Sequence, residues 1–131
     1  MVSEGLPPSD RLRRGREFEA VYRQGWKAHT RHFVVQGWAR PERRLRLGIT
    51  VSRKVGRAPE RNLVKRRIRE FFRRHRPEIQ QAVAENAGVE EGLDLVIIAK
   101  PGAPALTQPE LERELMAGLG KRRESGPRSK S

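Results

Sequence analysis

The side chains with the clearest chemical potential are cations that repeat along one stretch, from Arg61 to Arg76. A helix turns by about 100° per residue, and this rotation divides the stretch into two sides. The apolar side carries Val64, Ile68, Phe71, Phe72 and His75. The cationic side carries Asn62, Lys65, Arg66, Arg69, Arg73 and Arg76. Like charges one turn apart destabilise an isolated helix, so a row of phosphates that offsets the repulsion is the natural partner.

A solvated charged surface is the plainest alternative for this stretch. Such surfaces usually mix signs, whereas the stretch holds a single acid, Glu70, which lies off the cationic side. A helix lying on a membrane needs an apolar side that is free to enter lipid, and we expect this apolar side to be buried in a core. Two further classes stay open: a ribosomal or structural RNA-binding protein, and a DNA-binding protein that places the helix in the major groove.

Charge is distributed unevenly over the 131 residues, whose net charge is +13. Residues Ser52–Arg76 hold 11 basic and 2 acidic side chains, whereas Pro77–Leu119 hold 2 basic and 8 acidic ones. Concentrated positive charge predicts a polyanionic partner, with nucleic acid first. The chain contains no cysteine, which excludes disulfides and cysteine-based zinc sites.

Two aromatic residues, Phe18 and Tyr22, stand one helical turn apart and could stack unpaired bases, although helical spacing of this kind also produces core pairs. His29 and His32 suggest no third ligand at a metal spacing. Clustered carboxylates occur only in the acidic C-terminal part, where surface charge explains them. We therefore expect no catalytic residue and no metal site in the protein.

Several elements must position these side chains. Residues 1–10 are predicted to be a flexible N-terminal segment, residues 11–119 one RNA-binding domain, and residues 120–131 a basic disordered tail. Periodicity predicts helices over Arg16–Gln24, Arg61–Arg76 and Pro109–Gly118, and strands over Arg31–Ala39, Arg44–Ser52 and Asp94–Lys100. The first two strands are expected to pair as a hairpin around Pro41. Pro77 is expected to stop the basic helix, with a continuation through Gln80–Glu85 left open. The order α-β-β-α-β-α predicts an α+β two-layer sandwich.

The stretch from Gly48 to Glu70 resembles the bacterial ribonuclease P protein component. The motif consists of a basic pair, a Gly-basic-Ala loop and an Arg-Asn-x-x-Lys-Arg-x-x-Arg-Glu run. Here these are Arg53-Lys54, Gly56-Arg57-Ala58 and Arg61-Asn62-x-x-Lys65-Arg66-x-x-Arg69-Glu70. The resemblance continues through Arg11-Leu12-Arg13, Phe18…Val21-Tyr22…Gly25, Arg31…Phe33-Val34 and Asp94–Lys100, and it spans residues 11–119.

The resemblance implies a ribosomal-protein-like fold whose strand–helix–strand crossover is left-handed, against the usual rule. It also implies the role of an accessory subunit in an RNA-based endonuclease, ribonuclease P, which removes the 5′ leader from precursor tRNA. In that enzyme the RNA is the catalyst and requires Mg²⁺, and no cofactor is expected on the protein alone. The implied partners are ribonuclease P RNA and precursor tRNA, with neither a membrane nor a small-molecule substrate, in the cytoplasm.

The same resemblance assigns two sets of residues. The set expected to bind RNA is Arg53, Lys54, Arg57, Arg61, Asn62, Lys65, Arg66, Arg69 and Arg73. The set expected to form a cleft for the single-stranded leader is Phe18, Tyr22, Phe33, Ser52 and Lys100. The sequence departs from the family at Leu63 and Ser52, where a basic residue is common. Leu63 lies off the cationic side, so that side survives the change.

Overall fold

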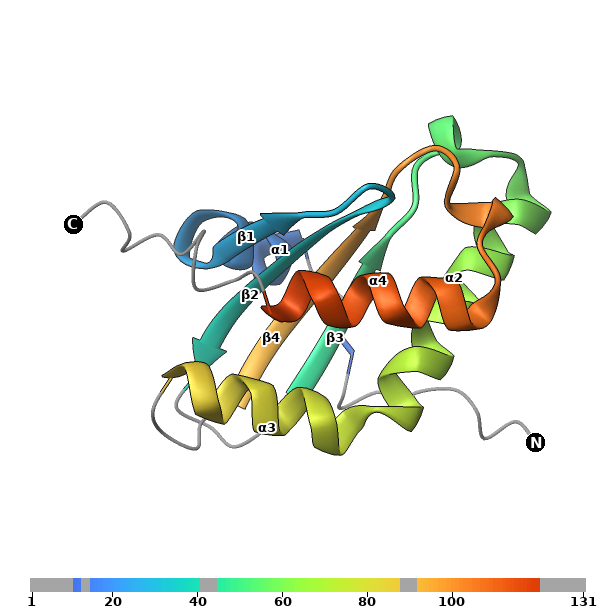
Figure 1. Cartoon of the computed structure of the whole chain (residues 1–131). Coiled ribbons are helices and arrows are strands. Elements are labelled where there is room, and N and C mark those ends of the chain that lie inside the picture. The colour runs from blue at the N-terminus through green and yellow to red at the C-terminus, as the bar shows by residue number, and fades with distance from the viewer. Residues whose placement is uncertain (1–10, 13–14, 41–44, 88–91, 121–131) are drawn as a thin grey trace.

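The structure is a computed structural model that describes residues 11–12, 15–40, 45–87 and 92–120 (Figure 1). Its elements in chain order are α1 (Gly15–Gln24), β1 (Trp26–His29), β2 (Phe33–Arg40), β3 (Leu45–Thr50), the short 3-10 helix η2 (Arg53–Val55), α2 (Ala58–Arg74), α3 (Arg76–Ala87), β4 (Gly92–Ala99), the 3-10 helix η3 (Ala103–Ala105) and α4 (Gln108–Gly120). The predicted flexible segment 1–10 and residues 121–131 of the predicted tail lie outside the described residues. Gly120, expected to begin that tail, is the last residue of α4.

The four strands form one sheet in the order β1-β2-β4-β3. The predicted hairpin between the segments that form β2 and β3 is wrong, because β4 lies between these two strands in the sheet. β4 pairs antiparallel with β2 and parallel with β3. Its apolar run is buried on both faces of the sheet, so a central position is where it removes most apolar surface from water. β2 instead pairs with β1, the strand that precedes it in the chain and that the sequence did not indicate.

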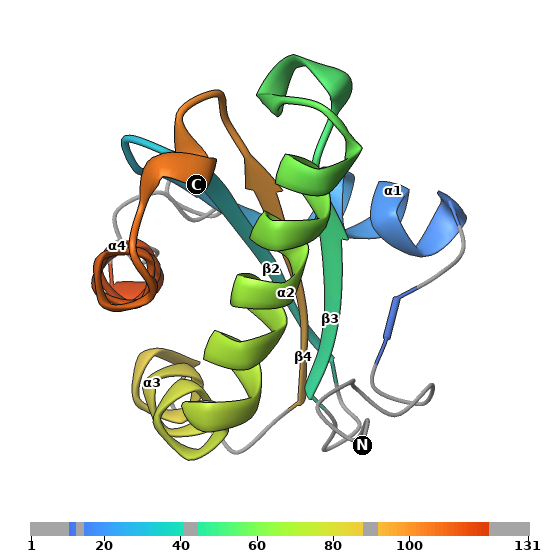
Figure 2. The ribbon, with the colours of Figure 1, turned by 90° about the vertical axis from the view of Figure 1, so that its right-hand side faces the viewer.

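The connection from β3 to β4 runs through α2 and α3. Both strands point towards the upper right of Figure 1, with β4 to the left of β3 and the helices α3 and α4 in front of the sheet. Figure 2 places α2 on that same side. This arrangement makes the crossover left-handed, as the resemblance implied and against the common right-handed rule.

The sheet has a large core on one face and a small one on the other. Among the described helices, α2, α3 and α4 cover the first face, and α1 covers the second (Figure 2). The larger core includes Phe33, Ile68, Phe71, Phe72, Ile79, Leu95 and Leu115. The smaller core is built from Leu12, Val21 and Val96, with Phe18, Trp38 and Ile98 packed against it. The α+β class is confirmed, and the two-layer description applies to the face with three helices, since α1 adds a partial layer behind it.

The basic helix begins earlier than predicted and is followed by a second helix. α2 starts at Ala58 and ends at Arg74, and α3 follows after His75. Pro77 lies in the first turn of α3, where its missing N–H disrupts no helical hydrogen bond. Ile79 of α3 is fully buried in the larger core, which explains why the chain resumes a helix after the proline.

Candidate nucleic-acid interface

The loop before α2 fixes how the chain enters the helix. The Glu60 carboxylate accepts a hydrogen bond from the Arg57 N–H at 2.8 Å and so caps the first turn. A Cβ atom at Gly56 would lie only 2.3 Å from that carboxylate, which explains the glycine at this position. Val55 is buried and anchors the loop. Three cations of the predicted RNA-binding set are exposed on it, namely Arg53, Lys54 and Arg57.

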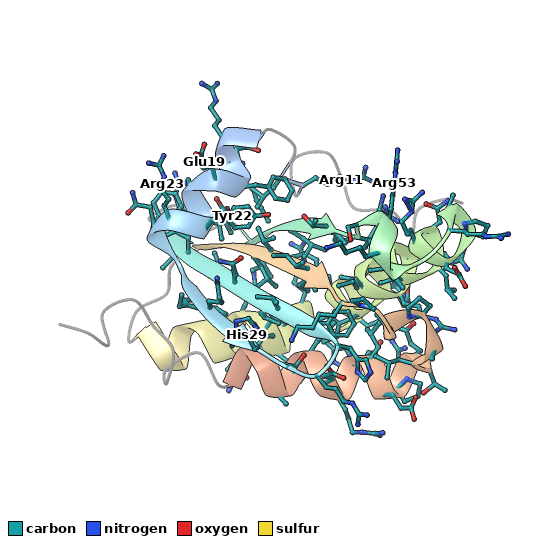
Figure 3. The ribbon with its side chains drawn as sticks, turned by 90° about the horizontal axis from the view of Figure 1, so that it is seen from above. Arg11, Glu19, Tyr22, Arg23, His29 and Arg53 are labelled. Atoms are coloured by element: carbon teal, nitrogen blue, oxygen red, sulfur yellow. The ribbon has the colours of Figure 1, made fainter. Side chains whose placement is uncertain are left out.

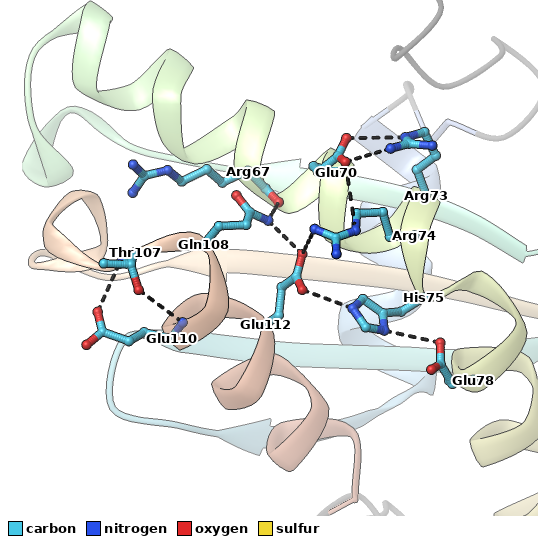
Figure 4. A network of polar contacts seen from close by, with 10 residues as sticks. All are labelled: Arg67, Glu70, Arg73, Arg74, His75, Glu78, Thr107, Gln108, Glu110 and Glu112. Atoms are coloured by element: carbon cyan, nitrogen blue, oxygen red, sulfur yellow. Dashed lines mark hydrogen bonds and ion pairs between the residues drawn. The ribbon is translucent and has the colours of Figure 1, made fainter.

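The apolar side of α2 faces the sheet as predicted, since Val64, Ile68, Phe71 and Phe72 are fully buried. His75 ends the helix instead of packing in the core. Its ring lies between two carboxylates, with Nδ1 3.1 Å from Glu78 and Nε2 2.9 Å from Glu112 (Figure 4). The end of α2 is thus held by acids of α3 and α4.

Arg67 and Arg74 of α2, which are not among the residues of the predicted cationic side, face the segment that contains α4. The Arg67 guanidinium donates a hydrogen bond to the Leu106 carbonyl, and Arg74 lies 3.6 Å from the Glu112 carboxylate. Burial would raise the pKa of Glu112, but hydrogen bonds from Gln108 and His75 outweigh it and lower that pKa. The Glu112 carboxylate of α4 therefore offsets the charge of Arg74, and the Leu106 carbonyl before α4 binds Arg67.

The opposite side of α2 carries the predicted cationic set. Arg66, Arg73 and the polar Asn62 are exposed, whereas Arg61, Lys65 and Arg69 are partly buried. Arg73 is not available as fully as the helical wheel suggested, because it binds Glu70 at 2.6 Å. That hydrogen bond lowers the pKa of Glu70. Positive charge on this side is therefore strongest from Arg61 to Arg69.

Arg69 has a cationic neighbour from a distant part of the sequence. Its pKa is lowered first by burial and then by the charge of Arg11. Arg11 is held in place at the edge of the sheet, where it bridges to Leu47, and the next N–H, that of Leu12, donates to the Leu47 carbonyl at 3.0 Å. Two guanidinium groups that repel each other favour an anion between them. Sequence reasoning placed Arg11 in the family motif but gave it no role, because only the folded chain brings it near α2.

The predicted aromatic pair lies on the face of the sheet that α1 covers. The Phe18 ring packs so closely on Gly48 that a Cβ there would lie 2.7 Å from the ring. Tyr22 is 42% exposed and is the large hydrophobic residue most open to solvent among those the structure describes. The two rings meet edge to face, with centroids 6.5 Å apart. Phe18 therefore packs against the sheet and supports Tyr22, whose ring is open to solvent (Figure 3).

Beside α1, a strip of this sheet face remains partly open. Cross-strand register aligns Val34, Ile98 and Thr50 in one row, and all three are only partly buried. In the neighbouring row, Gln36, Val96 and Gly48 are buried. The open row thus extends from β2 to β3 next to the exposed Tyr22.

Two predicted cleft residues flank the end of this strip. The ammonium group of Lys100 donates to the Thr30 carbonyl at 2.6 Å, which leaves it two further N–H donors. Ser52 is exposed at the end of β3, and its hydroxyl accepts a hydrogen bond from the Lys54 N–H at 3.3 Å. Both side chains help to shape the turns in which they lie.

The assignment of Phe33 to the cleft is wrong. Its side chain is fully buried in the larger core, on the face of the sheet opposite α1. Neighbouring residues of a strand point to opposite faces, so the adjacent Val34 is the one directed towards the strip. A shift of one residue in register decides between them, and the sequence alone did not fix it.

The match to a family model settles which proteins this chain resembles as a whole. The model described as Ribonuclease P matches residues 6–123. The chain belongs to the ribonuclease P protein family. It is 44% identical to the ribonuclease P protein component of Desulfovibrio desulfuricans, over 77% of this chain and 83% of that protein. It is 37% identical to that of a Geobacter species, over 94% of this chain and 97% of that protein.

Solved structures of ribonuclease P proteins share the fold described above. The protein from Staphylococcus aureus superposes with a TM-score of 0.68 at 30% identity, covering 84% of this chain and 92% of that one. The protein from Thermotoga maritima superposes with a TM-score of 0.68 at 29% identity, covering 85% and 96%. The likeness therefore includes the elements that carry both candidate surfaces.

Within residues 11–12, 15–40, 45–87 and 92–120, no three His, Cys, Asp or Glu side chains gather in a way that could hold a metal ion. No helix in the same described part is long and apolar enough to cross a membrane.

Proposed function

We propose that this chain is the protein subunit of ribonuclease P and that, with the RNA subunit, it removes the 5′ leader from precursor tRNA in the cytoplasm. The observation that carries the proposal is the family match over residues 6–123, which includes both candidate surfaces. The cations of α2 and the aromatic residues of α1 belong to helices on opposite faces of one sheet (Figure 2). One face can therefore hold the RNA subunit while the other holds substrate.

The RNA subunit binds along α2 and the loop before it. Arginine and lysine neutralise phosphates and release counterions, which supplies most of the affinity for nucleic acid. The rigid entry into α2, fixed by Glu60 and Gly56, holds the loop cations in a constant position relative to those of the helix. A preformed row of cations loses less side-chain freedom on binding than a mobile one.

The leader binds along the open strip beside α1. Exposed aromatic rings stack on unpaired bases, and each stacked base contributes about 1–3 kcal/mol. Tyr22 supplies such a ring, and the apolar row with Val34 and Ile98 supplies a surface next to it. Lys100 lies at one end of the strip and Ser52 at the end of β3, so donors for phosphate oxygens flank the bases. A duplex would keep its bases stacked on one another, so this surface favours single strands.

The chemical step belongs to the RNA subunit in this proposal, and no residue of this chain is assigned to it. Magnesium bound by the RNA would supply an activated water and stabilise the leaving oxygen. The protein's own residues bind and orient the two RNAs. Tighter binding through added phosphate contacts would lower the Mg²⁺ concentration that the reaction needs.

Reconstitution at low Mg²⁺ tests the proposal. The purified protein, the RNA subunit from the same organism and a precursor tRNA are combined, and release of the 5′ leader is measured. We expect cleavage only when protein and RNA are both present, and none by the protein alone. Absence of cleavage by the complete mixture would overturn the proposal. Cofractionation of the protein with ribosomes, or tighter binding to duplex DNA than to this RNA, would favour the alternatives instead.

A further inference from the structure

An ion network centred on one buried carboxylate lies on the same sheet face as the open strip, next to α1. The Asp94 side chain of β4 is only 4% exposed, and Arg46 of β3 binds it through two parallel hydrogen bonds, each 2.9 Å long. Arg40 of β2 adds a third cationic contact at 3.6 Å. The remaining Arg46 nitrogen, Nη1, lies 3.4 Å from the carboxylate of Glu17 in α1. The network therefore joins three strands to the helix that carries the aromatic pair.

Stability alone is a weak explanation for this network. Removing two charges from water costs roughly as much as their attraction returns, and apolar residues of similar size often stabilise a fold as well or better. A bidentate pair does fix geometry, because the planar guanidinium can lie in only one orientation against the carboxylate. Asp94 thus sets the direction in which Arg46 presents its third nitrogen to α1.

The small core on this face holds α1 through few apolar contacts. Val21 is the one residue of α1 that is buried, whereas α2 buries four. Phe18 is only partly buried, and it lies over Gly48 at the margin of the small core of Leu12, Val21 and Val96. A helix held by so few apolar contacts could shift along the sheet at little cost in buried area. An ion pair at its first turn opposes that shift.

We infer that Arg46, oriented by Asp94, is a positioning residue that sets the place of α1 through Glu17 and so determines how Tyr22 faces the strip. Glu17 directly precedes Phe18, on which the Tyr22 ring leans edge to face. A displacement of the first turn of α1 therefore moves both rings relative to Val34 and Ile98. This inference rests on the proposed binding of the leader to that strip.

The variants Glu17→Gln and Glu19→Gln form a matched test. Both residues lie near the start of α1, and both changes remove one negative charge, but Glu19 is exposed and is not part of the Arg46 network described here (Figure 3). Loss of a negative charge near RNA would by itself strengthen binding equally in the two variants. Loss of a positioning contact would weaken binding in Glu17→Gln alone.

The measurement is the affinity of the reconstituted holoenzyme for precursor tRNA with a full leader and for mature tRNA. For Glu17→Gln we expect leader-dependent affinity to fall by about two- to fivefold, the weight of a partly exposed ion pair. Affinity for mature tRNA and for the RNA subunit should not change, and Glu19→Gln should lose no leader-dependent affinity. Equal behaviour of the two variants, or equal losses on both tRNAs, would overturn the inference.

A double-mutant cycle with Tyr22→Ala separates positioning from general loss of structure. If Glu17 acts through the ring, Glu17→Gln should cost little further leader affinity once the ring is gone. Additive losses would contradict the inference. Arg46→Lys offers a second variant that keeps the charge but cannot form the planar bidentate pair with Asp94 that orients the side chain towards Glu17, and it should behave as Glu17→Gln does. If wild-type protein shows no preference for leader-bearing substrate, the proposed function fails at that point, independently of these variants.

Discussion

The contrast between Arg66 and Arg73 gives the sharpest test of how α2 meets RNA. Both side chains are exposed on the cationic side of the helix, about two turns apart. Arg73 is held by Glu70 at 2.6 Å, whereas Arg66 makes no ion pair with any described residue. A cation that already has a carboxylate partner releases fewer counterions when it meets a phosphate. The two residues should therefore differ in the salt dependence that each contributes.

The size of the difference follows from counterion release. Affinity falls as salt rises, and each lost phosphate contact makes the slope of log affinity against log salt less steep by about 0.7–0.9. We expect this change for Arg66→Ala. Over a fourfold range of salt, that change corresponds to about a threefold smaller fall in affinity. Arg73→Ala should reduce the steepness of the slope by less than about half as much, because a phosphate must first displace Glu70 from Arg73. Glu70→Gln should make the slope steeper, because it releases Arg73 to contact phosphate.

The assay is titration of the labelled RNA subunit with protein at constant Mg²⁺ and several KCl concentrations. Arg23→Ala is the matched control, because it removes one exposed arginine from α1 on the other face of the sheet (Figure 3) and should leave the slope unchanged. Equal slopes for Arg66→Ala and Arg73→Ala would refute the reasoning from the Glu70 pair. An equal effect of Arg23→Ala would show that net charge, and not the surface of α2, determines binding.

Three further outcomes are expected. Tyr22→Ala should weaken binding of leader-bearing precursor tRNA about tenfold through loss of one stacked base, with mature tRNA unaffected in the same equilibrium binding assay. Phe33→Ala should lower the free energy of unfolding by about 3–5 kcal/mol in a denaturant titration, because it empties a fully buried site, and any effect on leader affinity should match that on mature tRNA. Glu114 is partly buried, which would raise its pKa, but hydrogen bonds from Thr30 and His32 lower that pKa below its ordinary value of 4.5. A lowered folded-state pKa stabilises the fold above the unfolded value, so the excess in Tm of wild type over Glu114→Gln should be present at neutral pH and shrink as the pH falls below 4.5.

Helical periodicity predicted the orientation of α2 correctly because its two sides differ so strongly in polarity. The four apolar residues from Val64 to Phe72 are all fully buried, and the same pattern placed Arg67 and Arg74 off the binding side. The sequence did not reveal that Glu70 would bind Arg73, because the helical wheel placed the acid away from the cationic side. Long flexible side chains span the angle that separates them on the wheel.

The strand order was less accessible to sequence reasoning. β1 has only four residues and lies at an edge, so its pattern of burial is too short to stand out from a loop. The assumption that consecutive strands pair gave the wrong hairpin, because the hydrogen bonds of β2 are shared between β1 and β4. The error at Phe33 has another origin, because the resemblance assigned that residue to the cleft and the sequence pattern could not correct it. Four of the first five residues of β2 are buried, so polarity alone does not indicate which of them face α1.

The acidic groups of α4 have a consequence for how many RNA segments one protein can hold. A chain with a net charge of +13 that was basic on every side could bridge separate RNAs and precipitate them. Here Glu112 of α4 lies against Arg74 and His75, so an acidic group partly offsets the positive charge on the side of α2 that faces α4. The basic surface of the helix is therefore one-sided. If α2 binds RNA as proposed, this distribution of charge limits the number of structured RNA segments that one protein molecule can hold.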